Sequence, residues 1–377
     1  MVASKSFKWS AALIAVAGGA LVAGCGGSGS NASADAGGSG GSASAGATGG
    51  GGGANGSSGA ATKLTGAGAT FPFPLYSEWF STYNKAKGVQ INYQSIGSGA
   101  GIKQLTAQTV DFGASDAPVD DAGIAKMPSP IVHIPTAGGA VVLAYNLPGV
   151  TAKIKMTGAD VANIFLGKIT KWNDPALVKD NPGVALPNQT VTIAHRSDGS
   201  GTTNIFTNYL ASVSPEWKTK PGAGKSVDWP VGLGGKGNDG VAGIVKQTPG
   251  AIGYVELAYA KKKEHPLTYA LVQNKAGQYV EPSPASVTAA AEASAAALAA
   301  DVRAPIANAS APGAYPIAGF TYILAYKKQK DAAKGAALKD FLKWAMTDGQ
   351  KSAEGLLYAP LPAAVVAQNQ KTIDSIS

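Results

Sequence analysis

Cysteine and histidine are scarce in this chain of 377 residues. The single cysteine, Cys25, excludes an intramolecular disulfide. One cysteine and three histidines also leave too few soft ligands for a zinc site. The sequence therefore predicts no metal centre and no cofactor.

Charged residues are also few, at 14% of the chain. No run of lysine and arginine is long enough to form a nucleic-acid footprint, and the short cluster at 261–263 is typical of a solvated helix end. We therefore expect no nucleic-acid partner. The formal net charge of +8 would help to attract anions, although an ordinary basic surface explains it equally well.

The apolar stretch near the N-terminus, Ala11–Val22, is too short to span a bilayer as a helix. Lys5 and Lys8 precede it, as in an export signal, and it ends at Leu21–Cys25, which resembles the bacterial lipobox. The alternative is an ordinary signal peptide with a cysteine there by chance. We interpret residues 1–24 as a lipoprotein signal peptide and Cys25 as the lipidation site. The chain would then be exported to the periplasm or cell surface and anchored to a bacterial membrane.

Residues 25–61 consist almost wholly of glycine, serine and alanine, and they cannot bury a core. The sequence predicts a flexible tether over this stretch.

From Lys63 onward, short apolar strands alternate with segments of helical periodicity. This alternation predicts an α/β fold with mainly parallel sheets. The strands are expected around 89–93, 110–114, 140–145, 191–194 and 321–326, and the helices around 161–166, 203–213, 241–247, 285–300 and 338–346.

Four segments share one design, in which a strand or loop ends in small and hydroxyl residues before a helix. Free N–H groups at a helix N-terminus favour an anion, and serine and threonine hydroxyls add donors. One such segment is usually only a helix cap. Four together, one of them with an arginine, predict a site for a compact oxyanion; they are Thr65–Pro72, Ile96–Gly101, Phe112–Pro118 and Arg196–Thr203.

Two charged residues in these segments define the ligand more closely. Arg196 offers a planar fork that can bond two anion oxygens, and Asp198 is placed to orient it. Asp116 would repel an anion that brings no proton to donate. Hydrogen phosphate brings one and sulfate does not, so Asp116 would select phosphate over sulfate. The plainer alternative is that Asp116 caps the turn before Pro118.

These segments, with further stretches, resemble the phosphate-binding proteins of Pst-type ABC transporters. The resemblance covers about Leu64 to Pro362, and its further stretches are Thr109–Pro118, Leu166–Asp174, Trp229–Gly240 and Pro249–Glu256. It implies a two-lobed type II periplasmic-binding-protein fold with a hinge. Lobe 1 would comprise residues 62–138 and 316–377, and lobe 2 residues 139–315.

The resemblance also implies the binding residues and partners. The phosphate contacts would be Thr70, Phe71, Ser98, Asp116, Arg196, Ser200, Gly201 and Thr202, with Asp198 supporting Arg196. The chain would be a monomer that delivers phosphate to the permease and ATPase subunits of an importer. Alternatives on the same fold are a binder of another oxyanion and a phosphate sensor.

Competing enzyme and nucleotide motifs are weak. Gly235–Gly240 matches G-x-G-x-x-G but follows a poor Rossmann strand, and Thr219 stands where a P-loop ending at Ser226 needs glycine. Ser200 lacks the G-x-S-x-G elbow of a serine hydrolase. We therefore expect a binding protein rather than an enzyme.

Overall fold

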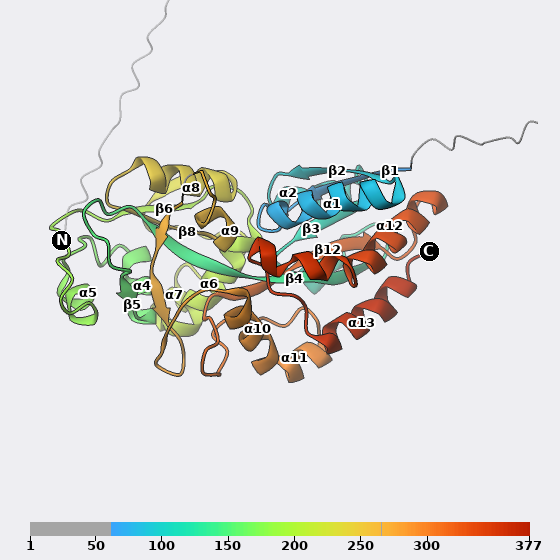
Figure 1. Cartoon of the computed structure of the whole chain (residues 1–377). Coiled ribbons are helices and arrows are strands. Elements are labelled where there is room, and N and C mark those ends of the chain that lie inside the picture. Colours follow the sequence, from blue (N-terminus) through green and yellow to red (C-terminus); the bar gives the residue numbers. More distant parts are fainter. Residues whose placement is uncertain (1–61, 265) are drawn as a thin grey trace, which may run out of the picture. The chain divides into compact units, whose positions relative to one another are not determined.

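The computed structural model describes residues 62–264 and 266–377 (Figure 1). The predicted signal peptide (1–24), the lipidation site Cys25 and the predicted tether (25–61) lie outside these residues.

Strands and helices alternate along most of the described chain, as predicted. The strands are β1 (Lys63–Gly68), β2 (Gln90–Ser95), β3 (Phe112–Ser115), β4 (Ile131–Tyr145), β5 (Lys155–Met156), β6 (Thr192–Arg196), β7 (Leu233–Gly235), β8 (Ala251–Glu256), β9 (Thr268–Tyr269), β10 (Leu271–Gln273), β11 (Tyr279–Val280) and β12 (Ala318–Tyr326). The α-helices are α1 (Phe73–Lys87), α2 (Ser98–Thr106), α3 (Asp121–Ile124), α4 (Gly158–Phe165), α5 (Pro175–Asp180), α6 (Gly201–Val213), α7 (Pro215–Thr219), α8 (Gly237–Gln247), α9 (Leu257–Ala260), α10 (Pro284–Ala293), α11 (Ala295–Ala300), α12 (Ala332–Ala345) and α13 (Ala363–Asp374). Two short 3₁₀ helices, η1 (Gly349–Ser352) and η2 (Glu354–Leu356), follow α12.

Most of the strands form one sheet, in the order β2-β1-β3-β12-β4-β8-β6-β7, with β9 also paired to β4. Strands β1, β2 and β3 are parallel to one another, and so are β6, β7 and β8. The prediction of parallel strands is therefore right within each of these two groups. The strands that join the groups, β4 and β12, are antiparallel to their neighbours, so the sheet as a whole is mixed.

Strand β4 connects the two groups directly. Its first ten residues, Ile131–Ala140, pair with β12, and its last five, Val141–Tyr145, pair with β8. We call β1, β2 and β3 with their helices the first strand group, and β6, β7 and β8 with theirs the second. Figure 1 shows α1 and α2 beside β1–β3, and α8 beside β6 and β8. The predicted lobe boundaries, 62–138 with 316–377 and 139–315, stay a prediction.

Helix spacing explains the core of the first group. Tyr76, Trp79, Phe80 and Tyr83 recur at intervals of three and four residues along α1, so they share one face of that helix and are buried. Aromatic rings of this face contact Phe112 of β3 and the two α12 residues Phe341 and Trp344.

The alanine-rich stretch expected to be one helix forms two. A capping box at Ser283 and Pro284 in the first turn start α10, which ends at Ala293. Ser294 separates it from α11, and its hydroxyl donates back to the Ala290 carbonyl at 2.9 Å. Across the part of the chain that the structure describes, no helix combines the length and apolar character needed to cross a membrane.

Candidate functional site

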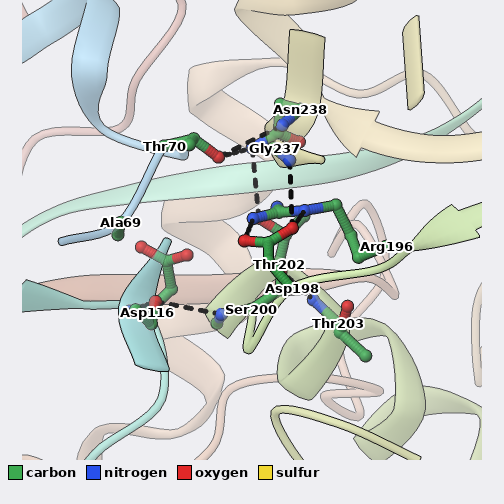
Figure 2. Close-up of polar contacts among 12 residues, drawn as sticks. Ala69, Thr70, Asp116, Arg196, Asp198, Ser200, Thr202, Thr203, Gly237 and Asn238 are labelled. Carbon is green, nitrogen blue, oxygen red and sulfur yellow. Dashed lines mark hydrogen bonds and ion pairs between the residues drawn. The ribbon is translucent and has the colours of Figure 1, made fainter. Parts of the chain in front are cut away.

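The candidate site lies where several strands end and helices begin. In the first strand group, β1 leads to Thr70 and Phe71, β2 to Ser98, and β3 to Asp116. In the second group, β6 ends at Arg196 and is followed by α6. The carboxyl ends of parallel strands meet at one edge of a sheet, which is where ligands bind in open α/β folds. The two groups bring these segments together (Figure 2).

Arg196 and Asp198 form an ion pair in which the arginine is buried and the aspartate partly buried. Arg196 donates from Nε to Asp198 Oδ1 at 2.7 Å and from Nη2 to Asp198 Oδ2 at 2.5 Å. The Arg196 side chain is only 1% exposed. Burial acts to raise the pKa of Asp198, but the hydrogen bonds and charge of Arg196 outweigh it and hold that pKa below its ordinary value. Asp198 also accepts from the Gly237 N–H at 3.0 Å, so the fork is held in one orientation.

Two threonine hydroxyls lie beside this pair, and Asn238 joins them. Thr202 Oγ1 accepts from Arg196 Nη1 at 3.3 Å and from Asn238 Nδ2 at 3.2 Å. Thr70 Oγ1 accepts from Asn238 Nδ2 at 2.8 Å and from the Asn238 N–H at 3.2 Å. All of these side chains are buried.

Ser98, in the first strand group, also accepts two hydrogen bonds from N–H groups. Ser98 Oγ accepts from the Gly201 N–H at 3.0 Å and from the Asp116 N–H at 3.4 Å. A hydroxyl has two acceptor positions and one O–H donor. Because N–H groups occupy both acceptor positions of Ser98, Thr70 and Thr202, each of these three hydroxyls is left to act as a donor. Together with Arg196, they make a cluster of donors suited to an oxyanion.

Asp116 is the acceptor in this cluster of donors. Its side chain is buried, and Oδ1 accepts from the Thr321 hydroxyl at 2.8 Å. Burial raises the pKa of Asp116 to about 7, although hydrogen bonding from Thr321 and the charge of Arg196 act to lower it. At neutral pH the carboxyl group can therefore both accept and release a proton.

The remaining predicted residues, Ser200, Gly201 and Phe71, adjoin the residues described above. Ser200 is the N-cap of α6, and its hydroxyl accepts from the Thr203 N–H at 3.0 Å. At Gly201 a Cβ atom would lie 2.5 Å from the Asp116 backbone nitrogen, so only glycine allows this approach. The Phe71 ring packs against Tyr358, whose hydroxyl donates to the Phe71 carbonyl at 2.6 Å. The structure thus gathers every predicted contact residue in one region.

Several residues that support the site were not singled out from the sequence. Asn238 lay in a motif considered for dinucleotide binding, and its position before a helix was the one available signal. Thr321, in the middle of β12, gave no local signal. The buried Glu256 and Tyr358 gave none either; burial raises the pKa of Glu256 well above its ordinary value, and Tyr358 hydrogen bonds to it at 3.0 Å.

Other chemistries receive no support from the described residues. Within 62–264 and 266–377, no three histidine, cysteine, aspartate or glutamate side chains come close enough to hold a metal ion. His195 stacks on Trp229 with ring centres 4.9 Å apart. The Ser200 hydroxyl caps its own helix, so the geometry shows no serine–histidine pair there.

Known proteins resemble this chain over most of its length. The family model of the PBP superfamily domain matches residues 53–349. The chain is 50% identical over 309 residues to the phosphate-binding protein PstS of Xylella fastidiosa strain Temecula1, which covers 82% of this chain and 84% of that protein. It is 39% identical over 335 residues to the PstS of Methanocaldococcus jannaschii, covering 80% and 84%. Among solved structures, a phosphate-binding protein from Stenotrophomonas maltophilia matches with a TM-score of 0.66 at 20% identity, over 82% of this chain and 93% of that one, a likeness of fold.

Proposed function

The chain belongs to the PBP superfamily and, within it, to the PstS phosphate-binding proteins, and on that premise we propose that it captures inorganic phosphate between its two strand groups. The observation that carries the proposal is the combination of a buried arginine fork and three donor hydroxyls with the carboxyl group of Asp116. The proposed contacts are Thr70, Phe71, Ser98, Asp116, Arg196, Ser200, Gly201 and Thr202, with Asp198 holding Arg196.

The donor groups account for affinity. Arg196 supplies charge and two directions of hydrogen bonding, and the hydroxyls supply one hydrogen bond each to oxygens of the ion. The N-terminus of α6 adds a favourable dipole. Within the second strand group, Asp198 holds Arg196 and Asn238 holds Thr202, so binding loses little entropy in ordering these two donors.

Asp116 accounts for selectivity. Hydrogen phosphate can donate its proton to the carboxylate, whereas sulfate places an oxygen lone pair against it. A buried acceptor without a donor costs free energy, whereas like-charge repulsion acts on both dianions and does not distinguish them. We propose that this contrast rejects sulfate.

We also propose that the chain works as the capture subunit of an ABC-type phosphate importer and not as an enzyme. Its PstS relatives are phosphate-binding proteins by name. In this proposal the two strand groups close over phosphate, and the closed form docks as a monomer on the permease. The lipid anchor at Cys25 would hold the exported chain at the membrane surface; a Cys25→Ala chain released from the membrane fraction would support that part.

Calorimetric titration with phosphate and then sulfate tests the proposal. The chain is first unfolded and refolded to remove any bound ion. We expect tight phosphate binding, little or no response to sulfate near pH 8, and no measurable phosphate binding by Arg196→Ala. A folded wild-type chain that ignores phosphate would refute the function. Unchanged binding by the Arg196 variant would refute the site.

A further inference from the structure

Asn238 lies in the first turn of α8 and is completely buried. We propose that Asn238 is a positioning residue of the phosphate site, which turns the hydroxyl hydrogens of Thr70 and Thr202 toward the ion. This inference rests on the proposed function. It concerns a residue that acts through two others and does not itself touch phosphate.

The orientation of the Asn238 amide is fixed by its other end. Its Oδ1 accepts from the Glu256 N–H at 3.0 Å. If the amide were reversed, its NH₂ group would face that N–H, and two donors would oppose each other. The oxygen must therefore face Glu256, and the NH₂ group must face the threonines.

The hydroxyl groups of Thr70 and Thr202 can then act only as donors. Nδ2 supplies one of the two N–H bonds that each of them accepts, at 2.8 Å for Thr70 and 3.2 Å for Thr202. With both acceptor positions filled, each O–H points away from these nitrogens and can donate only to a ligand or another acceptor. Without Nδ2, each hydroxyl regains a free acceptor position and more freedom to rotate. The ion would then have to order it on binding.

Asn238 also joins the two strand groups. Thr70 follows β1 of the first group, whereas Asn238 and Thr202 belong to helices of the second. Its contact with Thr70 therefore exists only while the groups are together. The Thr70 hydroxyl is thus oriented as a donor only when the two strand groups have closed. Tyr259 of the second group reinforces the same junction by donating to the Thr70 carbonyl at 2.5 Å.

A double-mutant cycle distinguishes positioning from general packing. Phosphate affinity is measured for the wild type, Asn238→Ala, Thr70→Val/Thr202→Val and the triple variant, with ³¹P magnetic resonance titration for the weak binders. We expect Asn238→Ala to weaken binding about 10- to 100-fold in the wild type, the effect of two misdirected hydrogen bonds to an ion. In the Thr70→Val/Thr202→Val variant, which we call the valine background, Asn238→Ala should weaken phosphate binding less than about threefold.

A structural role alone predicts a different result. If Asn238→Ala costs the same factor in both backgrounds, or nothing in the wild type, the inference is wrong. A wild type that binds no phosphate would instead refute the proposed function. The neighbouring Asp239→Asn is the matched control, because that side chain is 65% exposed, and it should change affinity less than about twofold.

Removing Asn238 also leaves the buried Glu256 N–H without its partner, so folding is checked by circular dichroism and thermal unfolding. If Asn238→Ala does not fold, Asn238→Asp takes its place in the cycle, since it keeps the acceptor for Glu256 and removes the donor. Its effect should again be larger in the wild type than in the valine background. Equal effects would overturn the inference.

Discussion

The pH dependence of sulfate binding depends on one side chain. Burial raises the pKa of Asp116 to about 7. Below that pH the carboxyl group is neutral and carries a proton that it can donate. Above it, the group is an anion that offers only acceptors. Sulfate needs donors, so we predict that it binds the protonated form and is rejected by the charged one.

The size of the effect follows from the protonated fraction of Asp116. With a pKa of about 7, the carboxyl group is almost fully protonated at pH 5 and about 1% protonated at pH 9. Sulfate affinity should therefore fall about 100-fold between these two values, mostly above pH 7. Asp116→Asn carries an uncharged NH₂ donor at every pH. It should bind sulfate with nearly the same affinity, within about threefold, across the range.

Calorimetric titration with sulfate at several pH values between 5 and 9 measures this. The control variant is Asp120→Asn. Like Asp116→Asn it removes one carboxylate, but Asp120 is the exposed N-cap of α3, so this variant should keep the wild-type slope. A wild type whose sulfate affinity does not change with pH would refute the reasoning. So would an Asp116→Asn variant with the full wild-type slope, because another group would then be titrating.

Further predictions follow from neighbouring contacts. Thr321→Val removes the hydrogen bond that lowers the pKa of Asp116, so the midpoint of the sulfate pH profile should move to higher pH; a midpoint that stays or falls contradicts this. Gly201→Ala places a Cβ atom 2.5 Å from the Asp116 backbone nitrogen, so it should cost about 1–3 kcal/mol of stability and weaken phosphate binding at least about tenfold. Wild-type affinity in that variant would show that the helix end can shift freely. Tyr358→Phe leaves the buried Phe71 carbonyl without its hydroxyl donor and should lower the free energy of unfolding in urea by about 1–3 kcal/mol; no change would mean that another donor replaces it.

Local patterns predicted several of the helices and strands, but none of the predicted ranges covered α1, α13, β1 or β8. The apolar period around 203–213 corresponds to α6, and the β-branched and aromatic residues at 321–326 lie in β12. The sheet as a whole was harder to predict, because the pairing of β12 with β3 and β4 joins segments far apart in sequence. No local signal shows that a late strand is inserted antiparallel between β3 and β4. The break at Ser294 was missed because alanine favours helix on both sides of it.

The residues of the candidate site likewise fall into those that the sequence could predict and those that it could not. Residues next to a glycine turn or a helix start, such as Ser98 and Arg196, could be found from local composition and from the resemblance to a family. Thr321 could not be found so, because a threonine inside a strand usually has only a structural role. Its position facing Asp116 depends on the register between β12 and β3, in which Tyr322 pairs with Ser115. Asn238 was visible as part of a motif, but its partners became clear only in three dimensions.

Arg196 has only 1% of its side chain exposed, so an ion bound to it is enclosed. Two properties of such an ion are distinct: its identity and the time for which it stays bound. Which ion is held is decided by the groups around it. How long it is held is decided by how often the backbone around it parts, and there the Gly99 N–H donates to the Gly199 carbonyl at 2.7 Å across the two strand groups. That bond involves no side chain. We expect the residence time of the ion to depend on this bond and on the side-chain bonds that also join the two groups, which involve Ser98, Asn238 and Tyr259.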